Sequence, residues 1–149
     1  EVCLRRLEHD VDLRPGLHGK TGRALHANEV NKLYGLVYEM CTQATPNNWS
    51  GKLYYTVLDE LREICEQRIV RRLKSASGQK LLDELIMEWD KHQVLIRTFH
   101  AILGYLDRFY VKRLALLTLR GAAVQAFHDF VFDEVKEQVT RAFLDEVNL

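Results

Sequence analysis

Apolar residues recur every three or four positions through most of the chain. This spacing gathers them on one face of a helix, and it predicts helices over residues 25–43, 53–74, 80–117 and 122–147. The stretch 80–117 is longer than a usual globular helix, so we expect two consecutive helices or one bent helix, with the change near His92 and Gln93. No convincing run alternates apolar and polar residues with the period of a strand. The pattern therefore predicts an all-α fold.

The helical pattern stops where proline, glycine and small polar residues gather. These breaks lie at 14–22 (RPGLHGKTG), 44–50 (ATPNNWS) and 75–78 (SASG). Proline disfavours helical backbone at the residue before it, and glycine weakens a helix, so we expect loops there. The opening residues 2–13 are weakly patterned, and at most a short helix is expected. Long helices joined by short loops pack antiparallel, as in a helical bundle or an α-solenoid.

Composition narrows the class of protein. The chain has 149 residues, which suits one domain, and its 21 Lys and Arg balance 21 Asp and Glu. A net charge of zero argues against nucleic acid as a partner. No run approaches the roughly 18 apolar residues of a membrane span, so no membrane is expected. The cysteines Cys3, Cys41 and Cys65 are odd in number, which favours a reducing, cytoplasmic or nuclear location.

Candidate catalytic and ligand motifs fail on their spacing. The glycines of 16–21 (GLHGKT) are separated by two residues, whereas a phosphate-binding loop requires four and a preceding strand. The six histidines form no zinc-type pair, and we expect His92 and His100 to be core or boundary residues. Cys41 and Cys65 lie in apolar stripes. Adjacent acidic residues diverge around a helix and belong to solvated faces. We therefore assign no catalytic residue, no metal ligand and no cofactor.

Large side chains beside the core rows are the remaining unusual feature. Val30, Tyr34 and Tyr38 form a row next to the row that carries Leu33, Val37 and Cys41. In the same way, Tyr105 and Arg108 lie beside the row of Ile102, Leu106 and Phe109. Tyrosine and arginine anchor many interfaces, because each covers a large area and ends in a polar group. Spacing alone leaves two interpretations open, a helix buried on two sides or a partner-binding surface.

Several segments resemble the N-terminal region of the cullins. They occur in the family's order at 33–43 (LYGLVYEMCTQ), 52–54 (KLY), 89–92 (WDKH) and 104–111 (GYLDRFYV). The resemblance extends from about residue 24 to residue 147, and it implies an α-solenoid of cullin repeats. It divides the chain into an N-terminal segment, 1–23, the first cullin repeat, 24–120, and the start of the second repeat, 121–149. Residues before Ala24 match poorly, and the loop 44–50 is shorter than in some cullins.

The resemblance also implies a function. Cullins are non-catalytic scaffolds of ubiquitin ligases, and their second and fifth helices bind an adaptor with a BTB/POZ-like fold. Tyr34 and Tyr38 match the interface positions of the second helix, and Tyr105 and Arg108 match those of the fifth. Val30 and Asn31 precede the tyrosines and are expected contacts as well.

The adaptor class and the extent of the chain are further expectations. Residues 37–43 look most like the class that uses a Skp-type adaptor with F-box receptors, whereas the BTB-adaptor and elongin-adaptor classes share the tyrosine-rich pattern. The family binds its RING subunit through a C-terminal region that this sequence does not include. We expect a scaffold fragment; the alternative is a free-standing helical protein that competes with full ligases for adaptors.

Overall fold

The computed structural model describes residues 25–148, and none of these residues forms a strand. The sequence predictions for 2–13 and 14–22, which include the glycine motif at 16–21, lie outside the described residues, as does Cys3. The helical elements are α2 (Ala27–Thr42), α3 (Ser50–Glu63), η1 (Ile64–Ile69), α4 (Val70–Lys74), α5 (Gly78–Ile102), α6 (Gly104–Leu106), η2 (Asp107–Val111), α7 (Leu119–Phe127), η3 (His128–Phe132) and α8 (Asp133–Val147). The prediction of an all-α fold is confirmed for this part of the chain.

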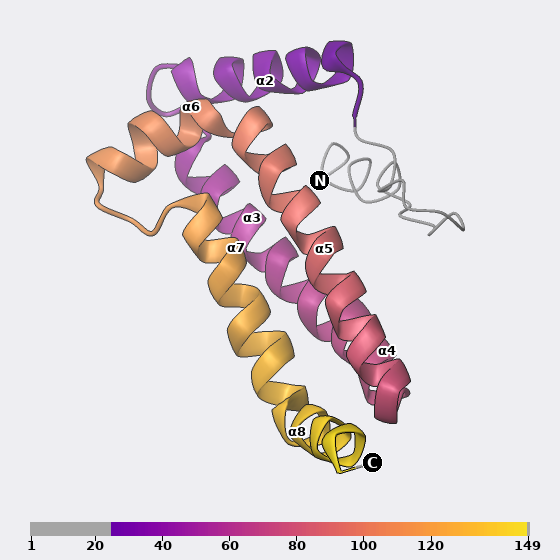
Figure 1. Cartoon of the computed structure of the whole chain (residues 1–149). Coiled ribbons are helices and arrows are strands. Elements are labelled where there is room, and N and C mark those ends of the chain that lie inside the picture. The colour runs from indigo at the N-terminus through magenta and orange to yellow at the C-terminus, as the bar shows by residue number, and fades with distance from the viewer. Residues whose placement is uncertain (1–24, 149) are drawn as a thin grey trace.

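Three long helical rods lie side by side, and a fourth helix crosses one end (Figure 1). The rods are α3 with η1 and α4, then α5, then α7 with η3 and α8, and consecutive rods run in opposite directions. Helix α2 lies across the end where α6 begins and contacts both α5 and α6. This crossing brings residues from α2 and from α6–η2 onto one corner of the molecule.

The core runs along the seam between the rods. Its largest fully buried side chains are apolar: Leu61, Leu73, Leu81, Ile102, Leu106, Leu119, Val57, Val111, Val131, Val135 and Cys65. Burying one such leucine or isoleucine contributes about 1.5–3 kcal/mol. The apolar stripes predicted from the sequence thus form the helix contacts, and the predictions for Cys41 and Cys65 as core residues are confirmed.

The predicted change near His92 and Gln93 is wrong. Helix α5 continues through both residues, and the break comes later, at Leu103, whose backbone leaves the helical region before α6 starts at Gly104. The helix continues because residues 79–102 contain no proline or glycine. The His92 ring is buried, and its Nε2 lies 2.7 Å from the Ala123 carbonyl oxygen of α7. The helical backbone also ends earlier than the predicted 117: it continues through η2 to Arg113, and residues 114–118 form a loop.

A capping motif ends the helical path after Arg113. Leu116 N–H donates to the Val111 carbonyl over 3.0 Å, and Ala115 N–H donates to the Lys112 carbonyl over 3.2 Å. These two bonds are the pattern of a Schellman cap, in which glycine is the usual residue at the left-handed position. Here Ala115 occupies that position, with a φ of 50°. The cap reverses the chain and leaves Leu114 and Leu117 half exposed.

Two side chains hold the loop that follows the cap. The Tyr54 hydroxyl of α3 donates to the Leu117 carbonyl over 2.8 Å. Asp107 accepts a 3.0 Å hydrogen bond from Leu119 N–H at the first residue of α7. These two hydrogen bonds hold the loop between η2 and α7 against α3 and η2.

Across residues 25–148, no helix combines the length and the apolar composition that a membrane span needs.

Candidate functional site

Four of the predicted binding residues come together where α2 crosses α6 and η2. The rings of Tyr38 and Tyr105 pack edge to face, with centroids 4.9 Å apart. Arg108 Nη2 donates to the Tyr34 hydroxyl over 2.8 Å, although 74 positions separate the two residues. The structure therefore brings the α2 tyrosines into contact with Tyr105 and Arg108, although the two groups lie far apart in the sequence.

Each of these side chains is placed by a buried neighbour on its own helix. On α2, Val37 and Cys41 are buried, so the adjoining row of Tyr34 and Tyr38 lies at the edge of the core, and Tyr38 is 48% exposed. On the other side, Leu106 is buried and directs Tyr105 and Arg108 toward α2 and solvent. The tyrosines thus contribute to the packing between helices and also keep exposed surface.

Phe109 belongs to the same surface, although the sequence pattern predicted a buried position for it. The helical spacing predicted that Phe109 would share the buried row of Ile102 and Leu106, but its side chain is 56% exposed. The cause is the π-helical turn η2, which holds one more residue than an α-helical turn. The next buried position after Leu106 is therefore Val111.

Phe109 packs on Tyr105 with ring centroids 4.5 Å apart. We call the surface formed by Tyr34, Tyr38, Tyr105, Arg108 and Phe109 the aromatic–arginine patch. A helical signal with a period of 3.6 residues cannot reveal the exposure of Phe109, because the π-helical turn changes the phase.

Val30 and Asn31 take different positions on the preceding turn of α2. Val30 is half-buried and packs against the hydrophobic core. Asn31 is exposed, three positions before Tyr34 and seven before Tyr38. Helical spacing places Asn31 beside the tyrosines, whereas Val30 is partly used in packing.

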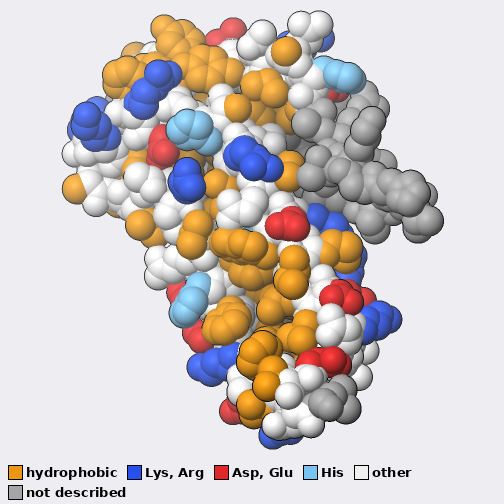
Figure 2. All heavy atoms as spheres, in the orientation of Figure 1, with side chains coloured by type: hydrophobic (Ala, Val, Ile, Leu, Met, Phe, Trp, Pro, Cys, Tyr) orange, Lys and Arg blue, Asp and Glu red, His pale blue; other side chains and the backbone are white. Residues whose placement is uncertain are grey.

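Two hollows flank Arg108. One, of about 430 Å³, lies toward the loop between α2 and α3, and the other, of about 560 Å³, lies toward Tyr34 and the start of α7. In the face that Figure 2 shows, lysine and arginine side chains gather with hydrophobic ones over the corner that holds α6 and the segment after it. The corner therefore offers aromatic surface and positive charge together.

The buried thiols lack the setting of a reactive cysteine. Burial raises the pKa of the Cys65 thiol to about 12 and also raises the pKa of Cys41. At neutral pH both groups are thiols rather than the nucleophilic thiolates.

The prediction for His92 as a core residue is confirmed, whereas His100 is exposed. The His92 ring packs against Trp89 and Phe127. Burial lowers the pKa of His92 and outweighs its hydrogen bond to Ala123 and the charge of Glu88, both of which raise it.

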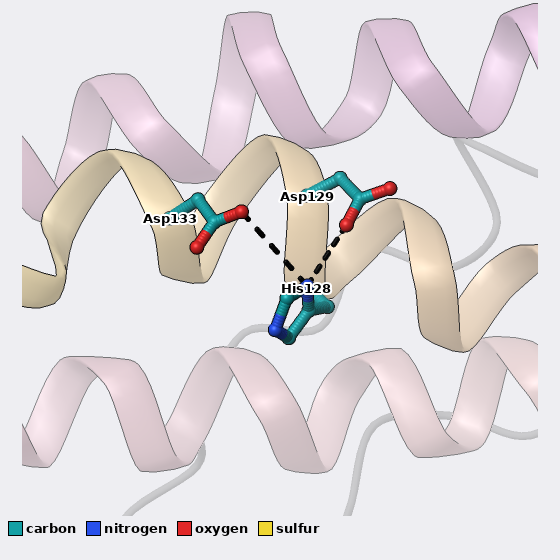
Figure 3. Close-up of side chains that lie close together, drawn as sticks. All are labelled: His128, Asp129 and Asp133. Atoms are coloured by element: carbon teal, nitrogen blue, oxygen red, sulfur yellow. Dashed lines mark hydrogen bonds and ion pairs between the residues drawn. The ribbon is translucent and has the colours of Figure 1, made fainter.

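One group of possible metal ligands was not visible in the sequence. His128, Asp129 and Asp133 lie on one turn of the helix formed by η3 and α8, and the His128 ring points between the two carboxylates (Figure 3). Its Nδ1 lies 2.8 Å from Asp129 Oδ1 and 4.0 Å from Asp133 Oδ2. The hydrogen bond raises the pKa of His128 and lowers that of Asp129. All three are exposed, so a surface ion pair accounts for the group.

Glu88, which belongs to none of the adjacent acidic pairs, is a buried acidic residue. Its side chain is buried on α5 and forms ion pairs with Arg72 of α4 and with Lys91, the latter over 3.3 Å. The pair with Arg72 joins α4 to α5 at the end of the molecule opposite α2, whereas the pair with Lys91 lies within α5. Removing a cation that pairs with a buried carboxylate is destabilising, because it leaves the buried negative charge less compensated. The arrangement is structural, since it lies away from the aromatic–arginine patch.

Comparison with known proteins identifies the family. Residues 13–149 match the Cullin alpha solenoid domain. The chain is 32% identical over 112 residues to Putative cullin-like protein 1 of Arabidopsis thaliana, which covers 75% of this chain and 16% of that protein. It is 28% identical over 132 residues to Cullin-1 of Oryza sativa subsp. japonica, covering 89% of this chain and 18% of that protein.

A third relative is shorter. Cullin-like protein 3 of Arabidopsis thaliana is 26% identical over 132 residues, which are 86% of this chain and 49% of that protein. The chain therefore spans between about one sixth and one half of the length of these three relatives. The domain match extends over most of the sequence and agrees with the all-α architecture, so this chain belongs to the cullin family.

Proposed function

We propose that this chain is the adaptor-binding part of a ubiquitin-ligase scaffold. In this proposal the aromatic–arginine patch binds an adaptor of BTB/POZ-like fold, and the helical rods hold that adaptor at a fixed distance from the rest of the ligase. The chain itself performs no chemistry. The RING subunit would bind to a region beyond this sequence, and the complex would act in the cytoplasm and nucleus.

The convergence of Tyr34, Tyr38, Tyr105 and Arg108 carries the proposal. Two segments far apart in the sequence meet in space with their aromatic rings and one guanidinium group at the surface. Aromatic and arginine side chains dominate the binding energy of many interfaces, especially where they lie together. Membership of the cullin family supports this partner class, because the residues that resemble cullin interface positions are these same four. Asn31 extends the surface along α2.

The division of the chain is part of the same proposal. Residues 24–120 would be the first cullin repeat and 121–149 the start of a second, so that the boundary would fall near the beginning of α7. The neighbouring rods α5 and α8 pack closely along the seam. Such packing gives a stiff spacer, since a solenoid transmits orientation through repeat-to-repeat contacts.

Among adaptor classes we favour a Skp-type adaptor that carries F-box receptors, because residues 37–43 resemble that class. The test is a binding titration of the 149-residue chain against three purified partners: a Skp-type adaptor with its F-box protein, a BTB adaptor and an elongin-type adaptor. We expect the Skp-type complex to bind at least about tenfold more tightly than the others, which corresponds to about 1.4 kcal/mol. Binding to another class would correct the class, and binding to none would refute the function.

A further inference from the structure

The 430 Å³ hollow beside the patch is lined by charges of one sign. Its charged side chains are Arg108, Lys112 and Arg113, and no aspartate or glutamate is among its lining residues. Its other walls include Ser50 at the start of α3, Asn48 in the loop before it, and the rings of Phe109 and Tyr110 on η2. Three positive charges therefore face a space that one or two side chains could fill.

These three cations have no acidic partner within residues 25–148. Along the helical rods, by contrast, several basic residues form ion pairs, such as Lys74 with Glu134 over 2.9 Å. Arg108 instead uses its guanidinium group on two neutral oxygens, the Tyr34 hydroxyl and the Gly104 carbonyl. Lys112 and Arg113 are exposed. An arginine has five N–H donors, so Arg108 retains donors for a further acceptor.

The walls of the hollow are held in place. Asn48 donates to the carbonyl oxygens of Cys41 and Gln43 over 2.9 and 3.1 Å, and it accepts a 3.0 Å bond from Ser50 N–H. The Tyr110 hydroxyl lies so close to Gly51 that a Cβ there would come within 2.9 Å of it. The loop wall and the aromatic wall are thus fixed before any partner arrives, which lowers the entropy cost of binding.

The hollow is continuous with the aromatic–arginine patch, since Tyr105, Arg108 and Phe109 belong to both. A protein that covers the patch therefore also covers the mouth of the hollow. Covering three unpaired cations without supplying an acid carries a desolvation penalty, whereas an inserted carboxylate forms charge-assisted hydrogen bonds with them. Charge complementarity of this kind selects one partner over others and speeds association.

We infer that the adaptor inserts an aspartate or glutamate side chain into this hollow, where Arg108, Lys112 and Arg113 bind its carboxylate. The inference rests on the proposed function and specifies the chemistry of the partner surface: an acidic residue next to an apolar one. The apolar residue packs on the rings of Tyr105 and Phe109, and the acid provides specificity.

The test compares two double variants of equal charge change. Lys112→Gln with Arg113→Gln removes two cations from the hollow, while Lys32→Gln with Arg97→Gln removes two exposed cations from elsewhere on α2 and α5. All four residues are exposed, so both variants should keep the wild-type melting temperature. Each is titrated with the adaptor that the wild-type chain binds, at NaCl concentrations from about 0.05 to 0.5 M.

The hollow variant should bind about tenfold more weakly than wild type at low salt, and the difference should shrink as salt rises. The control variant should stay within about twofold of wild type. Replacing the adaptor's inserted acid with lysine should weaken its binding to the wild-type chain. Lys112→Glu should restore the binding of that adaptor variant. Equal affinities of the two double variants would overturn the inserted-carboxylate model while leaving the proposed function intact. Absence of binding by the wild-type chain would overturn both.

Discussion

His92 joins two of the long rods through one buried hydrogen bond. Its Nε2 must be the donor, because the Ala123 oxygen 2.7 Å away can only accept. The other ring nitrogen, Nδ1, is buried and has no partner in residues 25–148. Protonation would therefore place a positive charge on a nitrogen that nothing solvates. This geometry explains why burial dominates and lowers the pKa of His92.

The lowered pKa of His92 predicts acid sensitivity. In the unfolded chain the ring takes up a proton near its usual pKa of 6.5, whereas in the folded chain it does so only at lower pH. The free energy of unfolding should thus fall as pH drops below about 6.5 and level off below the folded-state pKa. Urea unfolding between about pH 4.5 and 8 measures this slope. His92→Gln should be less stable but should lose much of the slope.

His128 provides the matched control, because its pKa is raised rather than lowered. The contribution of His128 to the free energy of unfolding is fully present below pH 6.5 and is lost as pH rises through the folded-state pKa. His128→Gln should therefore flatten the dependence of the free energy of unfolding on pH above 6.5, not below it. An unchanged acid-side slope in His92→Gln would contradict the assignment of that slope to the buried ring.

At the scale of elements, local periodicity predicted the helices well but not their interruptions. The rows that contain Val37, Leu61 and Val135 repeat with the helical period, and each lies in the core. The burial of His92, by contrast, depends on contacts with other helices, such as its bond to Ala123. Those contacts join residues far apart in sequence, which a local pattern does not encode.

The candidate site also has a part that the sequence pattern predicted and a part that it did not. Tyr34, Tyr38, Tyr105 and Arg108 stood out in the sequence because they lie one position from the core rows, and the structure brings them together. Phe109 was assigned to the core because the π-helical turn η2 changes the phase after Leu106. The hollow next to it was also out of reach, since the loop 44–50 and η2 form it jointly.

Ala115 tests the capping motif that ends the path after η2. A left-handed backbone costs a residue with a Cβ about 1–2 kcal/mol, and glycine avoids this cost but has more freedom in the unfolded chain. Ala115→Gly should therefore raise the free energy of unfolding by about 0.5–1 kcal/mol, measured by urea unfolding. Ala101→Gly, in an exposed part of α5, is the control and should lower it by about 0.5–1 kcal/mol. A loss of stability in both variants would contradict the cap.

At the scale of the whole molecule, the net charge of zero conceals an uneven distribution. The acidic and basic residues pair along the rods, as in Arg62 with Glu66 and Lys136 with Asp133. At the corner where α2 crosses α6, the basic side chains beside Phe109 have no acidic partner in the described residues. The overall balance of charge did not reveal this local concentration of positive charge, which suits an acidic protein surface.

The same corner holds the exposed aromatic rings, so the architecture concentrates binding features at one end of stiff rods. That arrangement suits a scaffold, since a partner held at one end keeps a defined orientation relative to whatever follows the other end. The central claim is that the aromatic–arginine patch, rather than the charge or shape of the chain in general, binds the adaptor.

The most direct test is a calorimetric titration of the adaptor into Tyr38→Ala with Arg108→Ala. Each anchor contributes about 2 kcal/mol or more, so the dissociation constant should rise by more than about 100-fold, with helical content unchanged. Tyr55→Ala with Arg97→Ala replaces exposed residues of the same types outside the patch, and it should bind like wild type. A dissociation constant for the patch variant within about threefold of the control would contradict the account.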